Sequence, residues 1–303
     1  MPPTIHLQAG THHFRLPAGQ PVLMGIVNTN RGSFSDQEHL DSLEAQLDRS
    51  MSLVEAGAGI IDVGFDSGVT TGPETSRDVG EQLEAGLPLV ERLVAQGVPV
   101  SVDTPFREVA RACLEAGAAM VNDVSGLADP VIAELCASHG AALVVLHTRA
   151  EHREERFPHY DDVVADVEDL FRERIELAVR HGLARERIVL DPGYDYAKLP
   201  HETVETIRAY PRFAELGLVF LSGVSRKYFT GIITGARPPE RLPETLATVA
   251  AVRGFPGFLR VHDVAEVARF LAVLEVIEGT RAFPPYSTDD ASMKYVPEAS
   301  DAV

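Results

Sequence analysis

The sequence contains few lysines, few cysteines and no long hydrophobic run, and each shortage argues against a class of protein. The formal net charge of −18 argues against nucleic acid as a partner, because most of the surface would repel a polyphosphate. The two cysteines, Cys113 and Cys136, are too few for a disulfide framework and favour a reducing, cytoplasmic location. No apolar run approaches the ~20 residues that span a bilayer, and residues 1–20 do not resemble a signal peptide, so a membrane partner is not expected.

One of the few lysines follows a predicted buried strand. The chain has only three, at positions 198, 227 and 294. The apolar run Leu218–Leu221 is typical of a buried strand, and the cationic tripeptide Ser225-Arg226-Lys227 follows it closely. A lysine at the carboxyl end of a hydrophobic strand indicates a rim where polar side chains gather.

The same alternation of apolar strand and helix recurs along the chain and predicts the fold. Strands are expected at 21–27, 59–64, 98–102, 119–121, 142–146, 187–190, 218–221 and 258–261. Helices are expected at 40–56, 77–95, 106–116, 130–138, 161–180, 201–208, 243–252 and 265–277. Eight such pairs predict an α/β protein, a (β/α)8 TIM barrel with parallel strands. An open doubly wound sheet is the alternative, but it would need a glycine-rich phosphate fingerprint after the first strand, which is absent.

The pattern also predicts the domain organisation. Residues 1–20 are expected to form an N-terminal hairpin that covers the bottom of the barrel. Residues 21–279 form the barrel as a single domain, since no linker-like stretch interrupts the series. Residues 280–303 form a loosely ordered C-terminal tail.

Polar side chains follow the predicted strands, and in a barrel of this class the active site lies at the carboxyl ends of the strands. In chain order these residues are Asn28, Asp62, Asp103, Asn122, His147, Asp191, Lys227, Arg260 and His262. Capping and contact with water explain some polar strand ends, but the whole set indicates a functional ring.

The ring divides by chemistry into two groups. The carboxylates and carboxamide of Asp103, Asn122 and Asp191 can present paired acceptors and donors to the edge of a flat heterocycle, with Lys227 at a ring carbonyl or nitrogen. Arg260 and His262 alternate on the last strand, so both are expected to point the same way. Together with Asn28 they suit an anion or its metal ion.

The motifs at these positions, in this order, resemble the dihydropteroate synthases, a pterin-binding family, from about Val22 to Ile277. They are Asn28 followed by Ser33-Phe34-Ser35-Asp36, then Ile61-Asp62-Val63-Gly64, Ser101-Val102-Asp103-Thr104, Asn122-Asp123-Val124-Ser125-Gly126, Asp191-Pro192-Gly193, Ser225-Arg226-Lys227 and Arg260-Val261-His262-Asp263. The resemblance implies a (β/α)8 barrel and a transferase of folate biosynthesis. Enzymes of this family join the pyrophosphate ester of 6-hydroxymethyl-7,8-dihydropterin to p-aminobenzoate and release pyrophosphate.

The resemblance also implies roles for individual residues. It assigns the pterin to Asp103, Asn122, Asp191 and Lys227, and the pyrophosphate to Asn28, Arg260 and His262, with Asn28 at a Mg²⁺ ion. Lys227, Asp103, Arg260 and His262 are then the catalytic group. Phe34, Tyr196 and Tyr228 are expected to line the pocket of the amine, and the protein is expected to be a homodimer that pairs through its late helices, including 264–277.

Several positions depart from the family pattern. Gly32 stands where an acid is usual, Gly68-Val69 where Thr-Arg is usual, and Tyr228 where a small Ser contacts the aminobenzoate. Asp195 adds a negative charge to the sixth loop. These differences leave open a paralogue with another acceptor or little synthase activity. A non-catalytic pterin-binding role and a methyltetrahydrofolate-dependent methyltransferase are further alternatives.

Overall fold

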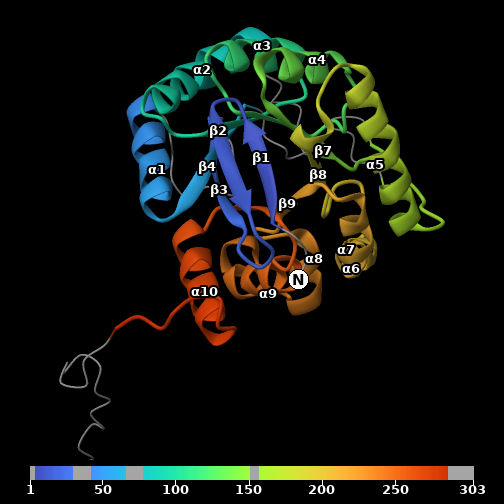
Figure 1. Ribbon diagram of the computed structural model, residues 1–303. Helices are drawn as coiled ribbons and strands as arrows, with labels where there is room; N and C mark the ends of the chain where they lie inside the picture. The colour runs from blue at the N-terminus through green and yellow to red at the C-terminus, as the bar shows by residue number, and fades with distance from the viewer. Residues whose placement is uncertain (1–3, 30–41, 66–77, 151–156, 286–303) are drawn as a thin grey trace, which may run out of the picture.

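A computed structural model shows a closed barrel of eight parallel strands in the order β10-β3-β4-β5-β6-β7-β8-β9 (Figure 1). It describes residues 4–29, 42–65, 78–150 and 157–285. The strands are β3 (Val22–Asn28), β4 (Ala58–Gly64), β5 (Val100–Asp103), β6 (Met120–Asp123), β7 (Ala142–Leu146), β8 (Ile188–Asp191), β9 (Val219–Gly223) and β10 (Gly257–Val261). The predicted (β/α)8 fold is confirmed.

Helices surround the barrel on its outside (Figure 1). They are α1 (Leu43–Glu55), α2 (Val79–Ala95), α3 (Arg107–Glu115), α4 (Val131–His139), α5 (Val163–Arg180), α6 (Pro200–Arg208), α7 (Tyr210–Phe213), α8 (Tyr228–Thr234), α9 (Leu242–Val252) and α10 (Val264–Ile277). The 3-10 helices among the described residues are η1 (Arg185–Arg187), η2 (Ala214–Leu216) and η3 (Pro238–Glu240). None of the helices in the described part of the chain has the length and apolar character to cross a membrane.

Strand β7 shows why the apolar runs form barrel strands. All five of its residues are buried, as expected for a parallel strand that is covered on both faces. Val144 belongs to the core inside the barrel. Its neighbours Leu143 and Val145 belong to the core between the barrel and the helices, since successive side chains point to opposite faces. Cys113 and Cys136 are buried in this outer core and, as predicted, form no disulfide.

Local signals set several helix ends. The Asp78 side chain accepts a hydrogen bond from the Glu81 amide at the start of α2, at 2.9 Å, which satisfies one of the free N–H groups there. Helix α4 ends at Gly140, whose φ of 63° is in the left-handed region that glycine adopts at little cost.

Helices α7 and α8 were not predicted from the sequence. No Ser, Thr, Asp or Asn directly precedes α8, which starts after Lys227. Its first amides instead donate to the carboxylate of Asp195, from the loop after β8, including Phe229 N at 3.3 Å. The cap comes from a distant part of the chain, so the usual start signal is missing.

The N-terminal hairpin closes the bottom of the barrel, as predicted. It pairs β1 (Ile5–Ala9) with β2 (His12–Leu16) in antiparallel register. Its inward side chains Leu7 and Leu16 are fully buried and belong to the core inside the barrel. The Gly10 amide donates to the carbonyl of Gly140, at 2.8 Å, just before β7 begins. The hairpin therefore lies at the amino ends of the strands and leaves the opposite mouth open to a ligand.

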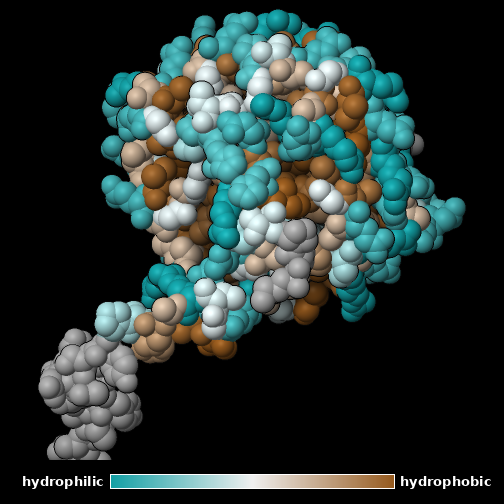
Figure 2. Space-filling view, viewed as in Figure 1, coloured by the Kyte–Doolittle hydropathy of each residue, from teal (hydrophilic) through white to brown (hydrophobic). Residues whose placement is uncertain are grey.

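The surface seen in Figure 2 is dominated by hydrophilic side chains over the outer helices, with apolar side chains in the spaces between them. This agrees with the formal charge of −18 and with apolar helix faces that turn toward the barrel.

The hairpin provides the first prediction. We expect Leu16→Ala to lower the free energy of unfolding by about 2–5 kcal/mol, because a fully buried side chain leaves a cavity. The matched control is Arg15→Ala, at an exposed neighbouring position, which should leave stability unchanged within error. Urea unfolding measures both, and equal stabilities for the two variants would show that the hairpin does not contribute to the core.

Candidate active site

Arg260 connects three strands at the mouth of the barrel. Its Nε atom lies 2.6 Å from Asp62 Oδ2, and its Nη2 atom lies 2.7 Å from Asp103 Oδ2. Asn122 Nδ2 donates to the same Asp62 oxygen, at 3.3 Å. The side chain of Arg260, on β10, thus reaches past β3 to β4 and β5. The sequence-predicted residues Asp103, Asn122 and Arg260 therefore form one network.

Asp62, which the sequence placed in the polar ring without a specific role, is a member of this network. Its side chain is completely buried, and a buried carboxylate needs a paired cation and hydrogen bonds. Burial disfavours the charge of Arg260, but Asp62 and Asp103 outweigh this and raise its pKa. The signal in the sequence was an aspartate inside an apolar strand, between Ile61 and Val63, which a purely structural strand would avoid.

Two acceptors of the network remain open. Among the described residues, Asp62 Oδ1 and Asn122 Oδ1 are buried and have no hydrogen-bond partner. Buried acceptors of this kind are normally satisfied by protein, water or ligand. They can receive N–H donors from a bound molecule.

Asp191 and Lys227 both lie beside Gly223 at the mouth. Asp191 Oδ1 accepts a hydrogen bond from the Gly193 amide, at 2.8 Å. A Cβ at Gly223 would lie 4.0 Å from Asp191 Oδ2 and 3.8 Å from Lys227 Nζ, so both groups flank this glycine. Burial raises the pKa of Asp191, opposed by the Gly193 N–H and by the charges of Lys227, Lys198 and Arg260.

Lys227 is held from the loop after β8. Its Nζ donates to the carbonyl of Tyr194, at 2.7 Å, and lies 5.0 Å from the centre of the Tyr196 ring, within the range of a cation–π contact. Burial lowers the pKa of Lys227, opposed by the charges of Asp195 and Asp191.

Tyr196 lies close to both the Arg260 network and Lys227. Burial raises the pKa of its phenol, and the charge of Asp103 raises it further, while Arg260 acts in the opposite direction. The ring is therefore close to the Arg260 network and also to Lys227. The structure brings the predicted pterin residues to one mouth of the barrel.

The residues predicted for the anion side have separate partners in the structure. Strand β10 ends at Val261, so strict alternation does not extend to His262. Arg260 contacts Asp62 and Asp103, whereas His262 Nδ1 lies 2.9 Å from Ser225 Oγ. Asn28 ends β3, with its side-chain oxygen against Gly64, where a Cβ would come within 2.4 Å.

The predicted amine pocket is only partly described. Tyr228 is exposed at the start of α8, beside the carboxylate of Asp195. Phe34 lies outside the described residues, as do Gly32, Gly68 and Val69.

His147, at the end of β7, faces a helix and not the ligand network. Its ring is fully buried, and Nε2 lies 2.8 Å from Asp166 Oδ1 on α5. Burial lowers the pKa of His147 to about 3, assisted by the charge of Lys198 and opposed by Asp166. We therefore assign His147 a structural role.

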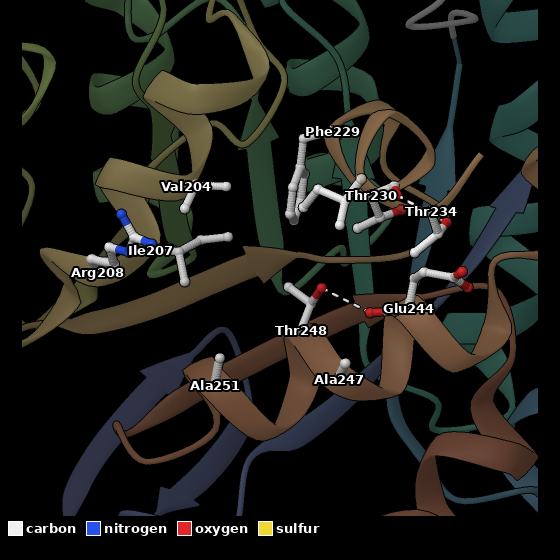
Figure 3. A pocket seen from close by; sticks show the side chains of 11 residues that line it. Val204, Ile207, Arg208, Phe229, Thr230, Thr234, Glu244, Ala247, Thr248 and Ala251 are labelled. Carbon is white, nitrogen blue, oxygen red and sulfur yellow. Dashed lines mark hydrogen bonds between the residues drawn. The ribbon is translucent and has the colours of Figure 1, made fainter. Parts of the chain in front are cut away.

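A separate cavity of about 360 Å³ lies among α6, α8 and α9 (Figure 3). Its walls are mostly apolar, with Arg208 and Glu244 among the lining residues. None of the predicted site residues lines it, so it is distinct from the barrel mouth.

The comparisons with known proteins agree with this geometry. Residues 24–262 match the family described as pterin binding enzyme. The dihydropteroate synthase of Synechocystis is 35% identical over 275 residues, which cover 86% of this chain and 94% of that protein. The Mycobacterium leprae dihydropteroate synthase is 38% identical over 254 residues, covering 80% of this chain and 88% of that protein.

Solved structures are similar as well. The Xanthomonas albilineans dihydropteroate synthase with 4-aminobenzoic acid superposes with a TM-score of 0.80 at 36% identity, covering 93% of this chain and 100% of that chain. The same enzyme in complex with 7,8-dihydropteroate gives a TM-score of 0.78 at 36% identity, covering 92% and 100%.

The Arg260 network yields a prediction on stability. We expect Arg260→Met to lower the free energy of unfolding by about 3–5 kcal/mol, because it leaves the buried Asp62 carboxylate without its cation. The control is Arg237→Met, which removes the exposed pair with Glu240 and should have no measurable effect. Chemical unfolding with the two variants side by side tests this; a wild-type stability for Arg260→Met would contradict the pairing.

Proposed function

Because the chain belongs to the pterin-binding enzymes and is a transferase of the dihydropteroate synthase type, we propose that it makes dihydropteroate. Its substrates in this proposal are the pyrophosphate ester of 6-hydroxymethyl-7,8-dihydropterin and p-aminobenzoate, and it releases pyrophosphate. The other acceptors considered from the sequence, and methyl transfer, gain no support from the relatives described above, which are named dihydropteroate synthases.

The observation that carries the proposal is the polar mouth of the barrel. Asp103 and Asn122 are joined through Asp62 and Arg260, and Asp191 and Lys227 flank Gly223 nearby. A pterin carries N–H donors and a ring carbonyl on its edges, which these carboxylates, amide and ammonium complement. The two open acceptors, Asp62 Oδ1 and Asn122 Oδ1, suit the N–H groups of such a ring.

The chemistry requires positioning more than acid–base catalysis. Loss of pyrophosphate breaks a C–O bond and leaves a methylene cation that the electron-rich pterin stabilises, and the arylamine nitrogen then attacks this carbon. The enzyme therefore needs to align the ring and neutralise the leaving group. In the proposal, Arg260, His262 and Asn28 neutralise the charge of the pyrophosphate leaving group.

Mg²⁺ fits this site as a partner of the pyrophosphate. Among the described residues no three His, Cys, Asp or Glu side chains form a group able to hold a metal. Mg²⁺ often binds through one or two protein oxygens together with substrate phosphates and water, and the amide oxygen of Asn28 at the end of β3 can provide one. When bound, the ion would neutralise charge on the leaving group.

We also place the protein in the cytoplasm as a homodimer. Its two cysteines are buried and unpaired, as in proteins of reducing compartments. Large apolar side chains are exposed on two of the late helices: Ile232 and Ile233 on α8, and Val273 and Ile277 on α10. Exposed apolar side chains on these helices suit a protein–protein contact.

The dimer proposal predicts that a charge on the exposed face of α8 lowers the mass of the assembly in solution. Ile233 is 68% exposed and also lines the cavity in Figure 3. We expect Ile233→Asp to shift sedimentation from dimer toward monomer, because a charge would be buried in an apolar contact. Glu266→Gln, on the exposed face of α10, serves as the control; a monomeric wild type would end the proposal.

The catalytic proposal is tested by pyrophosphate release. With the dihydropterin pyrophosphate and Mg²⁺, we expect release that depends on p-aminobenzoate. Lys227→Ala should weaken binding of the pterin substrate about 10–100-fold, because a charge-assisted hydrogen bond contributes about 1.5–3 kcal/mol. Its circular dichroism spectrum should match that of the wild type.

Arg237→Ala, which removes an exposed cation, is the matched control and should bind and react as the wild type does. If wild-type protein released pyrophosphate only with a different amine, the proposal that p-aminobenzoate is the acceptor would be wrong. If Lys227→Ala bound the pterin normally, the assignment of the site would be wrong.

A further inference from the structure

The loop between β8 and α6 has an unusual backbone. Gly193, Asp195 and Ala197 have φ values of 69°, 64° and 50°, all in the left-handed region. For residues other than glycine this conformation costs roughly 1–2 kcal/mol each. Such a backbone persists only when surrounding contacts hold it. A neighbouring group must therefore hold this loop in place.

Lys198 lies behind the loop and is only 2% exposed. Its Nζ donates to the carbonyls of His147, Gly193 and Tyr196, at 3.2, 3.0 and 3.2 Å. An ammonium group has three N–H donors, and all are used on main-chain oxygens. A Cβ at position 193 would come within 2.2 Å of the His147 carbonyl and 3.1 Å of Nζ, so glycine is required for these groups to meet.

The same loop also holds the residues of the mouth. The Gly193 amide donates to Asp191 Oδ1, at 2.8 Å. The Tyr194 carbonyl accepts from Lys227 Nζ, at 2.7 Å, and the Tyr196 ring lies beneath that ammonium. Lys198 thus contacts Gly193, directly before the Tyr194 carbonyl that positions Lys227, and Tyr196, two residues after it.

We propose that Lys198 is a positioning residue for the pterin substrate, acting through the loop on Asp191 and Lys227. The proposal rests on the proposed function, in which those two residues bind the pterin. Two of the three lysines of the chain then contact this loop: Lys227 on the side of the ligand and Lys198 behind the loop. Burial lowers the pKa of Lys198 to about 7, while the charges of Asp191 and Asp166 oppose the shift.

The test replaces Lys198 by a residue of similar length without a donor. We expect Lys198→Met to raise the dissociation constant for the dihydropterin pyrophosphate with Mg²⁺ at least tenfold, measured by calorimetry on folded protein. The KM for this substrate should rise in parallel, because the loop contacts act on Asp191 and Lys227. Lys198→Gln, which keeps N–H donors, should lose less affinity and serves as the comparison if Lys198→Met does not fold.

Thr206→Ala is the matched control for stability. Thr206 is fully buried on the adjoining helix α6 and donates to the Glu202 carbonyl, at 2.8 Å, without contacting the loop through that bond. We expect it to lower the melting temperature while keeping pterin affinity.

Wild-type pterin affinity in both Lys198 variants would overturn the proposal, as would an equal loss of affinity in Thr206→Ala. A wild-type protein that binds the pterin but releases no pyrophosphate would instead overturn the proposed function and leave the binding test of Lys198 intact.

Discussion

The ion pairs of Arg260 are the interaction on which the site depends. One guanidinium from β10 meets the carboxylates of Asp62 on β4 and Asp103 on β5, while Asn122 on β6 joins through Asp62. Buried charges are stable only when they are paired and hydrogen-bonded, so each member fixes the others. The network spans part of the barrel mouth and gives a flat ligand a rigid polar wall, as preorganised recognition requires.

The opposite side of the mouth is built differently, from a loop instead of a strand network. Lys198 is enclosed by main-chain carbonyls behind this loop, and Lys227 is held by a carbonyl on its front. Asp195, from the same loop, caps α8, the helix that begins directly after Lys227. The loop therefore couples the pterin side of the site to the start of a helix that carries the predicted amine-pocket residue Tyr228.

These arrangements also give physical meaning to the departures from the family pattern. The strand-borne polar residues of the mouth follow the motifs of the dihydropteroate synthases, and the chain matches those enzymes over most of its length. Among these departures, Asp195 lies in the loop after β8 and has an identifiable task as the cap of α8. A loop residue can change in this way without disturbing the barrel, because strands and not loops carry the core.

The sequence by itself determined the barrel, since eight apolar runs alternating with helices have few other ways to bury their surfaces. It also placed Asp103, Asn122, Asp191, Lys227 and Arg260 at strand ends, because that position follows from local pattern alone. Only the tertiary structure decided their partners. The pairing of Arg260 with Asp62 joins residues 198 positions apart, the cap of α8 comes from a loop 33 positions earlier, and Lys198 is enclosed by carbonyls that carry no signal in side-chain chemistry. Such contacts depend on how a closed barrel brings distant segments together, which no local pattern of residues encodes.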